Sequence, residues 1–237
     1  MTTLYQPRGK ASVYAKLAVN IYRQCSAGCR YCYCPQILHI TPSAFFTSNP
    51  RPRPGLVDDL LSACEEWAAV EDERPTVHLS FIGDPLPLGG DVGVTAEVIS
   101  VLHHFHLPVQ LLSKSGNLPP AILKLLGEDD SYGVTLTSIN PASVAYWEPF
   151  AGRADARINA LGEAAEVGVK TWVSLEPVIS FEDAAGVLNA LRGSSCSPVW
   201  IGSLNHLKPP YEWAEVKRRL ADVARECEIP VRWKDEV

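Results

Sequence analysis

The stretch Lys16-Leu-Ala-Val-Asn-Ile-Tyr22, together with Cys25-Ser-Ala-Gly-Cys29-Arg-Tyr-Cys32-Tyr-Cys34 just after it, decides how the rest of the chain is interpreted. The first part is apolar and rich in residues that favour extended structure, so it predicts a strand. The second part places four cysteines within ten residues. The sequence therefore predicts a cysteine loop directly after the first strand.

Beyond this stretch, short apolar runs alternate with longer segments of helical periodicity. The predicted strands are 16–22, 76–82, 109–113, 132–138, 171–175, 199–203 and 230–233, and the predicted helices are 56–70, 92–105, 121–126, 154–167, 181–192 and 213–227. This alternation indicates an α/β protein with one parallel sheet and outer helices, in a single domain spanning 1–237. A doubly wound open sheet and a barrel both fit the pattern, but no glycine-rich dinucleotide fingerprint follows the first strand. We predict a partial (β/α)6 TIM-type barrel with a short C-terminal strand.

Residues with chemical potential follow several of the predicted strands. They are the cysteine loop, Gly83-Asp84-Pro85, Lys114, Asn140, Glu176 and Asn205. In both architectures the loops after the strands meet at one rim, which is where such folds carry function. We therefore predict one active site at that rim.

Composition and charge narrow the class of protein. No apolar run approaches the roughly 20 residues needed to cross a bilayer, and the first ten residues lack the apolar stretch of a secretory signal, so a cytoplasmic location and no membrane partner are expected. The formal net charge of −6 argues against a protein that coats nucleic acid by bulk electrostatics. Arg51-Pro-Arg53-Pro is interpreted as a solvated loop stiffened by proline. The seven cysteines are odd in number and clustered, which favours metal or redox chemistry over a disulfide framework.

The spacing C-x3-C-x2-C of Cys25, Cys29 and Cys32 suits an iron–sulfur cluster. Three thiolates on one short loop can bind three irons of a cubane and leave the fourth iron open to chemistry. Gly28 allows the loop to wrap tightly. Two other interpretations remain: a zinc site, although zinc usually takes two cysteine pairs from separate knuckles, and a ferredoxin-like cluster with Cys34 as fourth ligand, although the gap after Cys32 does not match that spacing.

The pattern C-x3-C-x-aromatic-C after a first strand resembles the radical S-adenosylmethionine (SAM) superfamily. The resemblance implies that Cys25, Cys29 and Cys32 bind a 4Fe–4S cluster, that SAM chelates the open iron and that Tyr31 packs near the adenine. It also implies that a reductase such as flavodoxin or ferredoxin supplies one electron. SAM would then be cleaved to methionine and a 5′-deoxyadenosyl radical, which abstracts hydrogen from the substrate. Cys34 would be a thiol beside the cluster, either packed, which is the preferred interpretation, or catalytic as a hydrogen-atom donor.

Further contacts with SAM are expected after the second and third strands. The turn at Gly83 and Asp84 resembles, in part, the glycine-rich turn whose backbone receives the SAM amino group in this superfamily. Lys114 closes the third predicted strand, where its ammonium is expected to pair with the SAM carboxylate. An ordinary turn and a solvated lysine remain the alternatives.

The later strands offer weaker candidates. Ser138 and Asn140 end the fourth predicted strand, where the superfamily often contacts the ribose hydroxyls, although short polar residues also suit a turn. Glu176 and Arg153 are interpreted as contacts with SAM or substrate, or as a buried ion pair that supports the rim. His78 is expected to be a core residue with satisfied hydrogen bonds.

Several segments resemble particular branches of the superfamily. Residues 20–34 and Leu112-Ser-Lys-Ser115 resemble the branch that contains spore photoproduct lyase, and Ser174-Leu-Glu-Pro177 with the chain after it resembles a radical SAM group common in phages and bacteria. The first branch implies a nucleic-acid base or nucleotide as the substrate of a lyase-type or transferase-type reaction. The alternatives are radical modification of a peptide or protein, and a non-enzymatic iron–sulfur or zinc binding module.

Overall fold

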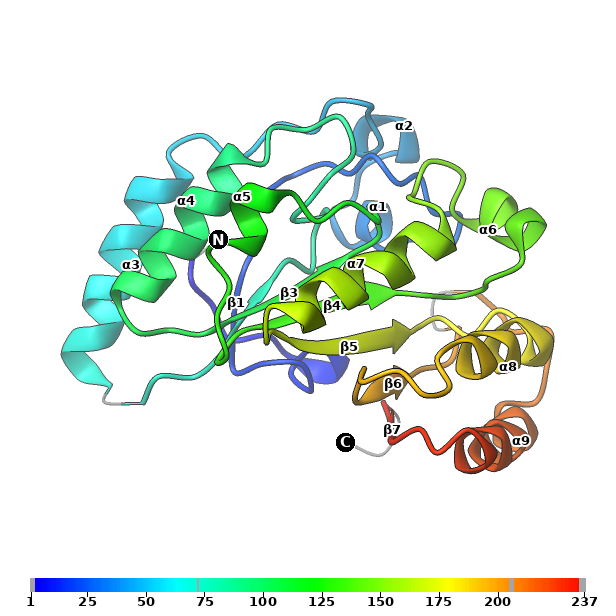
Figure 1. Cartoon of the computed structure of the whole chain (residues 1–237). Helices are drawn as coiled ribbons and strands as arrows, with labels where there is room; N and C mark the ends of the chain where they lie inside the picture. The colour runs from blue at the N-terminus through cyan, green and yellow to red at the C-terminus, as the bar shows by residue number, and fades with distance from the viewer. Residues whose placement is uncertain (1–2, 72, 205–206, 235–237) are drawn as a thin grey trace.

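The computed structural model describes residues 3–71, 73–204 and 207–234 and forms a parallel sheet flanked by helices (Figure 1). The strands of the sheet are β1 (Leu17–Val19), β2 (Val77–Leu79), β3 (Val109–Ser113), β4 (Ser131–Thr135), β5 (Lys170–Leu175), β6 (Val199–Ile201) and β7 (Val231–Trp233). Every neighbouring pair is parallel, and the strands lie side by side in the order of the chain. A doubly wound sheet reverses its strand order part-way, so the sequential order confirms the predicted partial barrel of the TIM type.

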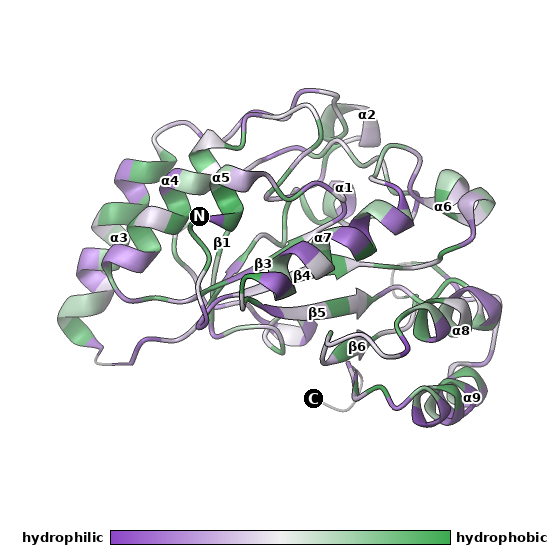
Figure 2. Ribbon diagram, in the orientation of Figure 1, coloured by the Kyte–Doolittle hydropathy of each residue, from purple (hydrophilic) through white to green (hydrophobic). Residues whose placement is uncertain are grey.

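The helices agree with the predicted pattern and add three short ones. The structure has α1 (Cys34–Ile37), α2 (Pro42–Phe45), α3 (Leu56–Val70), α4 (Gly93–His104), α5 (Pro120–Leu123), α6 (Pro141–Trp147), α7 (Ala154–Glu166), α8 (Phe181–Ala190) and α9 (Trp213–Glu226), and a 3-10 turn at Gly9–Ala11. The helix α7 packs on β4 and β5, while α3 packs on α4 and α8 on α9. Figure 2 shows apolar and polar residues mixed around these outer helices, as expected for helices with one face on the core. In the described part of the chain, none of the helices is long and apolar enough to cross a membrane.

The first two strands are shorter than predicted because a side chain replaces their ladder. The side-chain oxygen of Asn20 accepts hydrogen bonds from the backbone N–H groups of Phe81 and Ile82, each at 2.9 Å. This bridge holds the two chains together beyond β1 and β2 without strand pairing. It thereby frees the loops above the strands to carry the cysteines and the Gly83 turn.

The N-terminal segment closes part of the gap between β1 and β7. Tyr5 pairs in antiparallel fashion with Ala18, through Tyr5 N to Ala18 O at 3.1 Å and Ala18 N to Tyr5 O at 2.8 Å. The chain then runs to Tyr14, whose ring lies 5.4 Å from the ring of Trp172 and 5.7 Å from that of Trp200. The N-terminal segment therefore fills the interior of a barrel that its strands alone leave open.

Candidate active site

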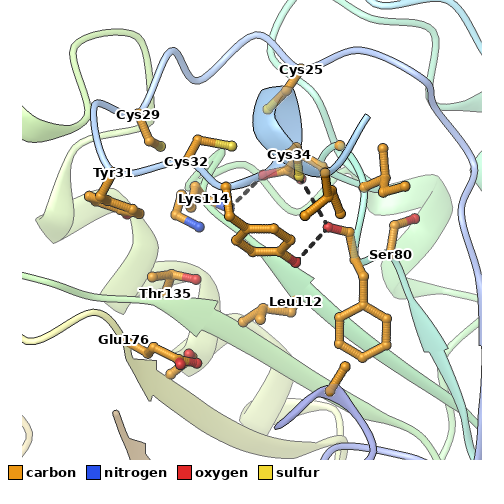
Figure 3. A pocket seen from close by; sticks show the side chains of 18 of the residues that line it. Cys25, Cys29, Tyr31, Cys32, Cys34, Ser80, Leu112, Lys114, Thr135 and Glu176 are labelled. Atoms are coloured by element: carbon orange, nitrogen blue, oxygen red, sulfur yellow. Dashed lines mark hydrogen bonds between the residues drawn. The ribbon is translucent and has the colours of Figure 1, made fainter. Parts of the chain in front are cut away.

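One cavity of about 800 Å³ occupies the end of the barrel to which the strands point (Figure 3). Its wall is formed by the cysteine loop, by residues that follow the strands and by the N-terminal segment. Side chains at alternate strand positions face it, among them Leu112 on β3, Thr135 on β4 and Ser174 on β5. The cavity lies where the strand order predicts an active site.

Cys25, Cys29 and Cys32 all line this cavity. Burial raises the pKa of Cys25 and of Cys29 to about 12. The pKa of Cys32 is also raised, first by its hydrogen bond with Cys34 and then by burial. Three neutral, buried thiols on one wall become thiolates when a metal replaces their protons.

The loop that carries the three thiols is held by its backbone. Cys25 N donates to Phe45 O at 3.2 Å, and Cys32 N donates to Cys29 O at 3.1 Å. Gly28 has φ +63°, and a Cβ atom there would lie 2.7 Å from Cδ2 of Phe150. Glycine is therefore required both by the left-handed backbone and by the close approach of the aromatic ring.

Cys34 begins α1 and is buried beside the cysteine loop. Its thiol donates to the carbonyl oxygen of Phe81 at 3.5 Å, and the residue lines the cavity (Figure 3). A thiol held in this way is packed and yet faces the space in which a substrate would lie. The two interpretations of Cys34 thus describe one position.

The Gly83-Asp84 turn is fixed to the end of β3 by the Asp84 carboxylate. This carboxylate accepts hydrogen bonds from the Ser113 hydroxyl at 2.7 Å, from the Lys114 N–H at 2.7 Å and from the Leu86 N–H at 2.9 Å. Gly83 has φ +78°, and a Cβ atom there would lie 2.8 Å from the backbone oxygen of Gln24. Asp84 therefore acts by shaping the turn, and both Gly83 and Asp84 line the cavity.

Lys114 extends from the end of β3 into the cavity (Figure 3). Burial lowers its pKa, but the nearby charges of Cys29, Glu148 and Asp84 outweigh burial, so the pKa is raised overall. Its ammonium lies 5.8 Å from the centre of the Tyr31 ring. Among the residues that the structure describes, none accepts a hydrogen bond from this ammonium, which leaves it available for an anionic ligand.

Tyr31 is oriented by a buried ion pair behind the cysteine loop. Its hydroxyl donates to Oε1 of Glu148, which also accepts from the Thr137 hydroxyl at 3.2 Å. Oε2 of Glu148 lies 2.6 Å from a guanidinium nitrogen of Arg157, and both side chains are 0% exposed. The structure therefore pairs Glu148 with Arg157, whereas Arg153 is exposed and bound to Asp155.

The inner end of the cavity is lined by aromatic rings and a polar network. The hydroxyl of Tyr14 lies 3.1 Å from Oγ of Ser174 and donates to Oε2 of Glu176 at 3.1 Å. Lys234 donates to the same oxygen at 2.5 Å, and its ammonium lies 4.1 Å from the centre of the Tyr14 ring. Burial raises the pKa of Tyr14, and the Glu176 carboxylate raises it further. Glu176 therefore lies at the cavity and pairs with Lys234, in place of the suggested Arg153.

His78 on β2 also belongs to this inner end, which corrects its interpretation as a satisfied core residue. Its ring stacks on Tyr14 and on Phe81, with ring centres 5.3 and 4.3 Å apart. Its Nδ1 lies 3.0 Å from the side-chain oxygen of Gln110, which places the proton on Nδ1. Burial lowers the pKa of His78 to about 4, and its Nε2 has no hydrogen-bond partner among the described residues. A neutral, unpartnered acceptor nitrogen is therefore part of the cavity lining.

Two candidates lie outside the lining of this cavity. The Ser138 hydroxyl donates to Asp183 at 2.5 Å, and the Asn140 side chain accepts from the N–H of Ala142 as the N-cap of α6. Thr135, two residues before Thr137 on the same segment, lines the cavity instead. Asn205, the last of the predicted rim residues, lies outside the described residues.

The sequence interpretation did not include Tyr14, Thr135 or Lys234 among the site residues. Thr135 and Lys234 follow from strand alternation, because residues two apart on a strand face the same side. Tyr14 comes from an irregular segment, where no periodic signal indicates which side chains point inward.

A family model described as the radical SAM superfamily matches residues 19–188, which is well over half of the sequence. The chain belongs to the radical SAM superfamily. It is accordingly a radical SAM enzyme, and the matched range contains the cysteine loop, the Gly83 turn and Lys114.

Solved structures of two kinds of protein share this fold. Spore photoproduct lyase complexed with dinucleoside spore photoproduct is 14% identical with a TM-score of 0.69, over 99% of this chain and 79% of that one. SuiB from Streptococcus suis bound to S-adenosylmethionine is 11% identical with a TM-score of 0.67, over 91% of this chain and 46% of that one. SuiB bound to the precursor peptide SuiA is 12% identical with a TM-score of 0.67, over 91% and 48%. The chain thus spans about half the length of SuiB, and no curated protein matches its sequence.

The residues at the site fit the two groups that this family implies, a 4Fe–4S cluster and SAM. Soft thiolates are the usual ligands of iron–sulfur clusters, and three buried thiols share one wall of the cavity. The ammonium of Lys114, without an acceptor in the described part of the chain, fits the carboxylate of SAM. The cavity volume of about 800 Å³ lies within the range of sites that hold molecules of this size.

Proposed function

We propose that Cys25, Cys29 and Cys32 hold a 4Fe–4S cluster on one wall of the cavity, and that SAM binds between this wall and Lys114. The observation that carries the proposal is the position of three thiols and one buried ammonium around a single cavity. When bound, the cluster supplies the electron that cleaves SAM to methionine and a 5′-deoxyadenosyl radical, which takes a hydrogen atom from the substrate.

The chain's own residues bind, orient and enclose the reactants. Lys114 offsets the negative charge of the SAM carboxylate in a site of low water content. Asp84 holds the Gly83 turn against β3, so that the turn's backbone is fixed before SAM arrives. Glu148 fixes Tyr31, the aromatic residue of the cysteine loop, for contact with the adenine. Cys34, beside the ligands and facing the cavity, is positioned to return a hydrogen atom to a substrate radical.

We propose a nucleic-acid base or nucleotide as the substrate. The inner end of the cavity offers the rings of Tyr14 and Phe81 for stacking, which a planar base requires. It also offers an acceptor at His78 Nε2 and the charged pair of Glu176 and Lys234, which suit a ring that carries both donors and acceptors. Spore photoproduct lyase, which shares the fold, was solved with a dinucleoside photoproduct.

A peptide substrate is the second candidate, because SuiB was solved with its precursor peptide. About half of the SuiB chain has no counterpart in this chain, and an extended peptide needs more contacts than a single base. A single zinc ion is a poorer alternative. Among the described residues, no three His, Cys, Asp or Glu side chains converge on one ion, whereas the thiols of a cubane are spread around its corners.

The test is anaerobic reconstitution followed by addition of dithionite and SAM, with 5′-deoxyadenosine measured by chromatography. We expect product from the wild type and none from Cys29→Ala. Cys64→Ala is the matched control, since Cys64 is a buried free cysteine on α3. Absence of product from wild-type protein with full iron and sulfide would refute the cluster and SAM assignment.

The substrate is tested in the same assay by adding dinucleotides, oligonucleotides or peptides. We expect nucleotide-containing compounds to accelerate formation of 5′-deoxyadenosine, and to transfer deuterium into it when they are labelled at the reacting carbon. Acceleration and deuterium transfer by peptides alone would instead establish the second candidate.

A further inference from the structure

Two large aromatic side chains are exposed on the outer side of the cysteine loop. Tyr146 is 55% exposed and Phe150 is 67% exposed, at the end of α6 and shortly after it. Arg30 of the cysteine loop is exposed beside them, with its guanidinium 4.4 Å above the Tyr146 ring. We call Arg30, Tyr146 and Phe150 the rim patch. The mechanism proposed above uses none of these three side chains.

The rim patch is attached directly to the backbone that carries the cluster ligands. Arg30 Nε donates to Tyr146 O at 2.6 Å, and Phe150 N donates to Ala27 O at 3.2 Å. The Phe150 ring packs against Gly28, the residue before Cys29. The three cysteines line the cavity from the inner side of this loop, so the rim patch forms its outer side.

The charge of the chain is strongly uneven around this loop. Residues 1–57 contain seven Lys and Arg and no Asp or Glu, whereas the remaining 180 residues contain 14 Lys and Arg and 27 Asp and Glu. The cysteine loop lies within the acid-free part of the chain. Asp155, which follows the rim patch, is paired with Arg153. A partner that approaches the outer side of the loop therefore meets positive charge, although the whole chain carries −6.

We propose that the rim patch is the docking surface for a small, acidic, one-electron carrier protein of the flavodoxin or ferredoxin class. This proposal rests on the cluster proposed above and adds the place where its electron arrives. One electron passes from the carrier to the cluster; the carrier is oxidised by one electron, the cluster is reduced by one, and no covalent bond changes.

Three physical arguments support this partner. Electron transfer falls steeply with distance, and the rim patch is separated from Cys29 by little more than the thickness of the loop. Tyrosine, phenylalanine and arginine are the residue types that anchor protein interfaces, whereas redox encounters need only a small contact area. An acidic carrier is complementary to the acid-free segment, which favours rapid association.

The proposal is tested with a bacterial flavodoxin and the cluster-loaded enzyme. Binding is measured by fluorescence anisotropy of labelled flavodoxin, and cluster reduction by stopped-flow absorbance with pre-reduced flavodoxin. Phe150→Ser is expected to raise the Kd by about tenfold or more and to slow reduction at low flavodoxin concentration. Arg30→Gln is expected to weaken binding at low salt and to flatten its dependence on ionic strength.

Matched controls come from other parts of the surface. Val70→Ser changes an apolar side chain that is 78% exposed at the end of α3, and Lys124→Gln removes a positive charge just after α5. Both should bind flavodoxin like the wild type. Iron and sulfide are measured for every variant, and Tyr146→Ser, which lies outside the cysteine loop, replaces Arg30→Gln if that variant loses iron.

Cleavage of SAM with dithionite separates this proposal from the cluster proposal, because dithionite needs no docking surface. We expect rim-patch variants to retain dithionite-driven cleavage while they lose flavodoxin binding. Unchanged Kd and reduction rate in Phe150→Ser and Tyr146→Ser would overturn the docking proposal even if dithionite-driven cleavage is normal. Loss of oligonucleotide binding with unchanged flavodoxin binding would also overturn it, and would assign the rim patch to the substrate.

Discussion

Replacing Arg157 with methionine should destabilise the protein by about 3–5 kcal/mol, because it leaves a buried carboxylate without its partner. Arg157 and Glu148 are both fully buried, and their charged atoms lie 2.6 Å apart. The guanidinium also donates to the backbone oxygens of Gly152 at 2.8 Å and Thr135 at 2.7 Å. Methionine retains much of the apolar volume but satisfies none of these groups. For a chain of this length the loss corresponds to a fall in Tm of roughly 6–20 °C.

The measurement is urea unfolding of the cluster-free, reduced protein followed by tryptophan fluorescence. Arg153→Met is the matched control, because Arg153 begins the same helical region but is 84% exposed and pairs with the exposed Asp155. We expect this control to unfold like the wild type, since exposed ion pairs contribute little. A loss below about 1 kcal/mol for Arg157→Met, or equal losses for the two variants, would refute the reasoning.

The double variant Glu148→Gln with Arg157→Met tests the cause of the loss. If an unpaired buried charge is responsible, removing the carboxylate should restore part of the stability that Arg157→Met loses. If the packing of the arginine is responsible, the two substitutions should instead add. Because Glu148 also accepts the Tyr31 hydroxyl, the single variants should report on the order of the cysteine loop as well.

Three further predictions concern the cavity. Lys114→Met should weaken SAM binding by about tenfold or more, measured by calorimetry, without loss of iron, and Lys124→Met should not. Cys34→Ala should retain iron, sulfide and cleavage of SAM; a parallel loss of iron would favour Cys34 as a fourth ligand and the binding-module alternative. The folded-state pKa of His78 is lowered to about 4, so the unfolded chain binds the extra proton first as pH falls below about 6.5. His78 should therefore reduce stability between pH 6.5 and 4 by up to about 1.4 kcal/mol per pH unit, and His78→Gln, compared in urea unfolding over that range, should flatten the slope.

The order of strands and helices could be predicted from the sequence because hydrophobic periodicity is a local signal. The ends of β1 and β2 could not, since the chain there is held by the Asn20 side chain from another loop. The short helix α6 was also missed, because Asn140-Pro141 is as typical of a turn as of a helix start. Local patterns thus determine which elements exist, while their limits depend on contacts between distant segments.

The candidate site shows the same division. The cysteine loop, Gly83, Asp84 and Lys114 follow directly from their positions after strands, and the structure brings them to one cavity. Arg153 and Arg157 are both plausible partners for a carboxylate in the sequence, four residues apart on one helical segment. Only the rotation of α7 against the sheet determines that Arg157 is buried and Arg153 is exposed. Spacing alone cannot decide such a choice.

The open barrel explains why a residue from the N-terminal segment belongs to the cavity. A complete barrel fills its interior with side chains from its own strands, but here β1 and β7 remain unpaired in the described part of the sheet. Tyr14 enters this space, and its ring contacts Trp172 and Trp200 below while its hydroxyl reaches Glu176 at the cavity. One side chain therefore both completes the core and forms the floor of the cavity. Because the floor is fixed by aromatic packing, the depth available to a substrate is set by the fold rather than by loop movement.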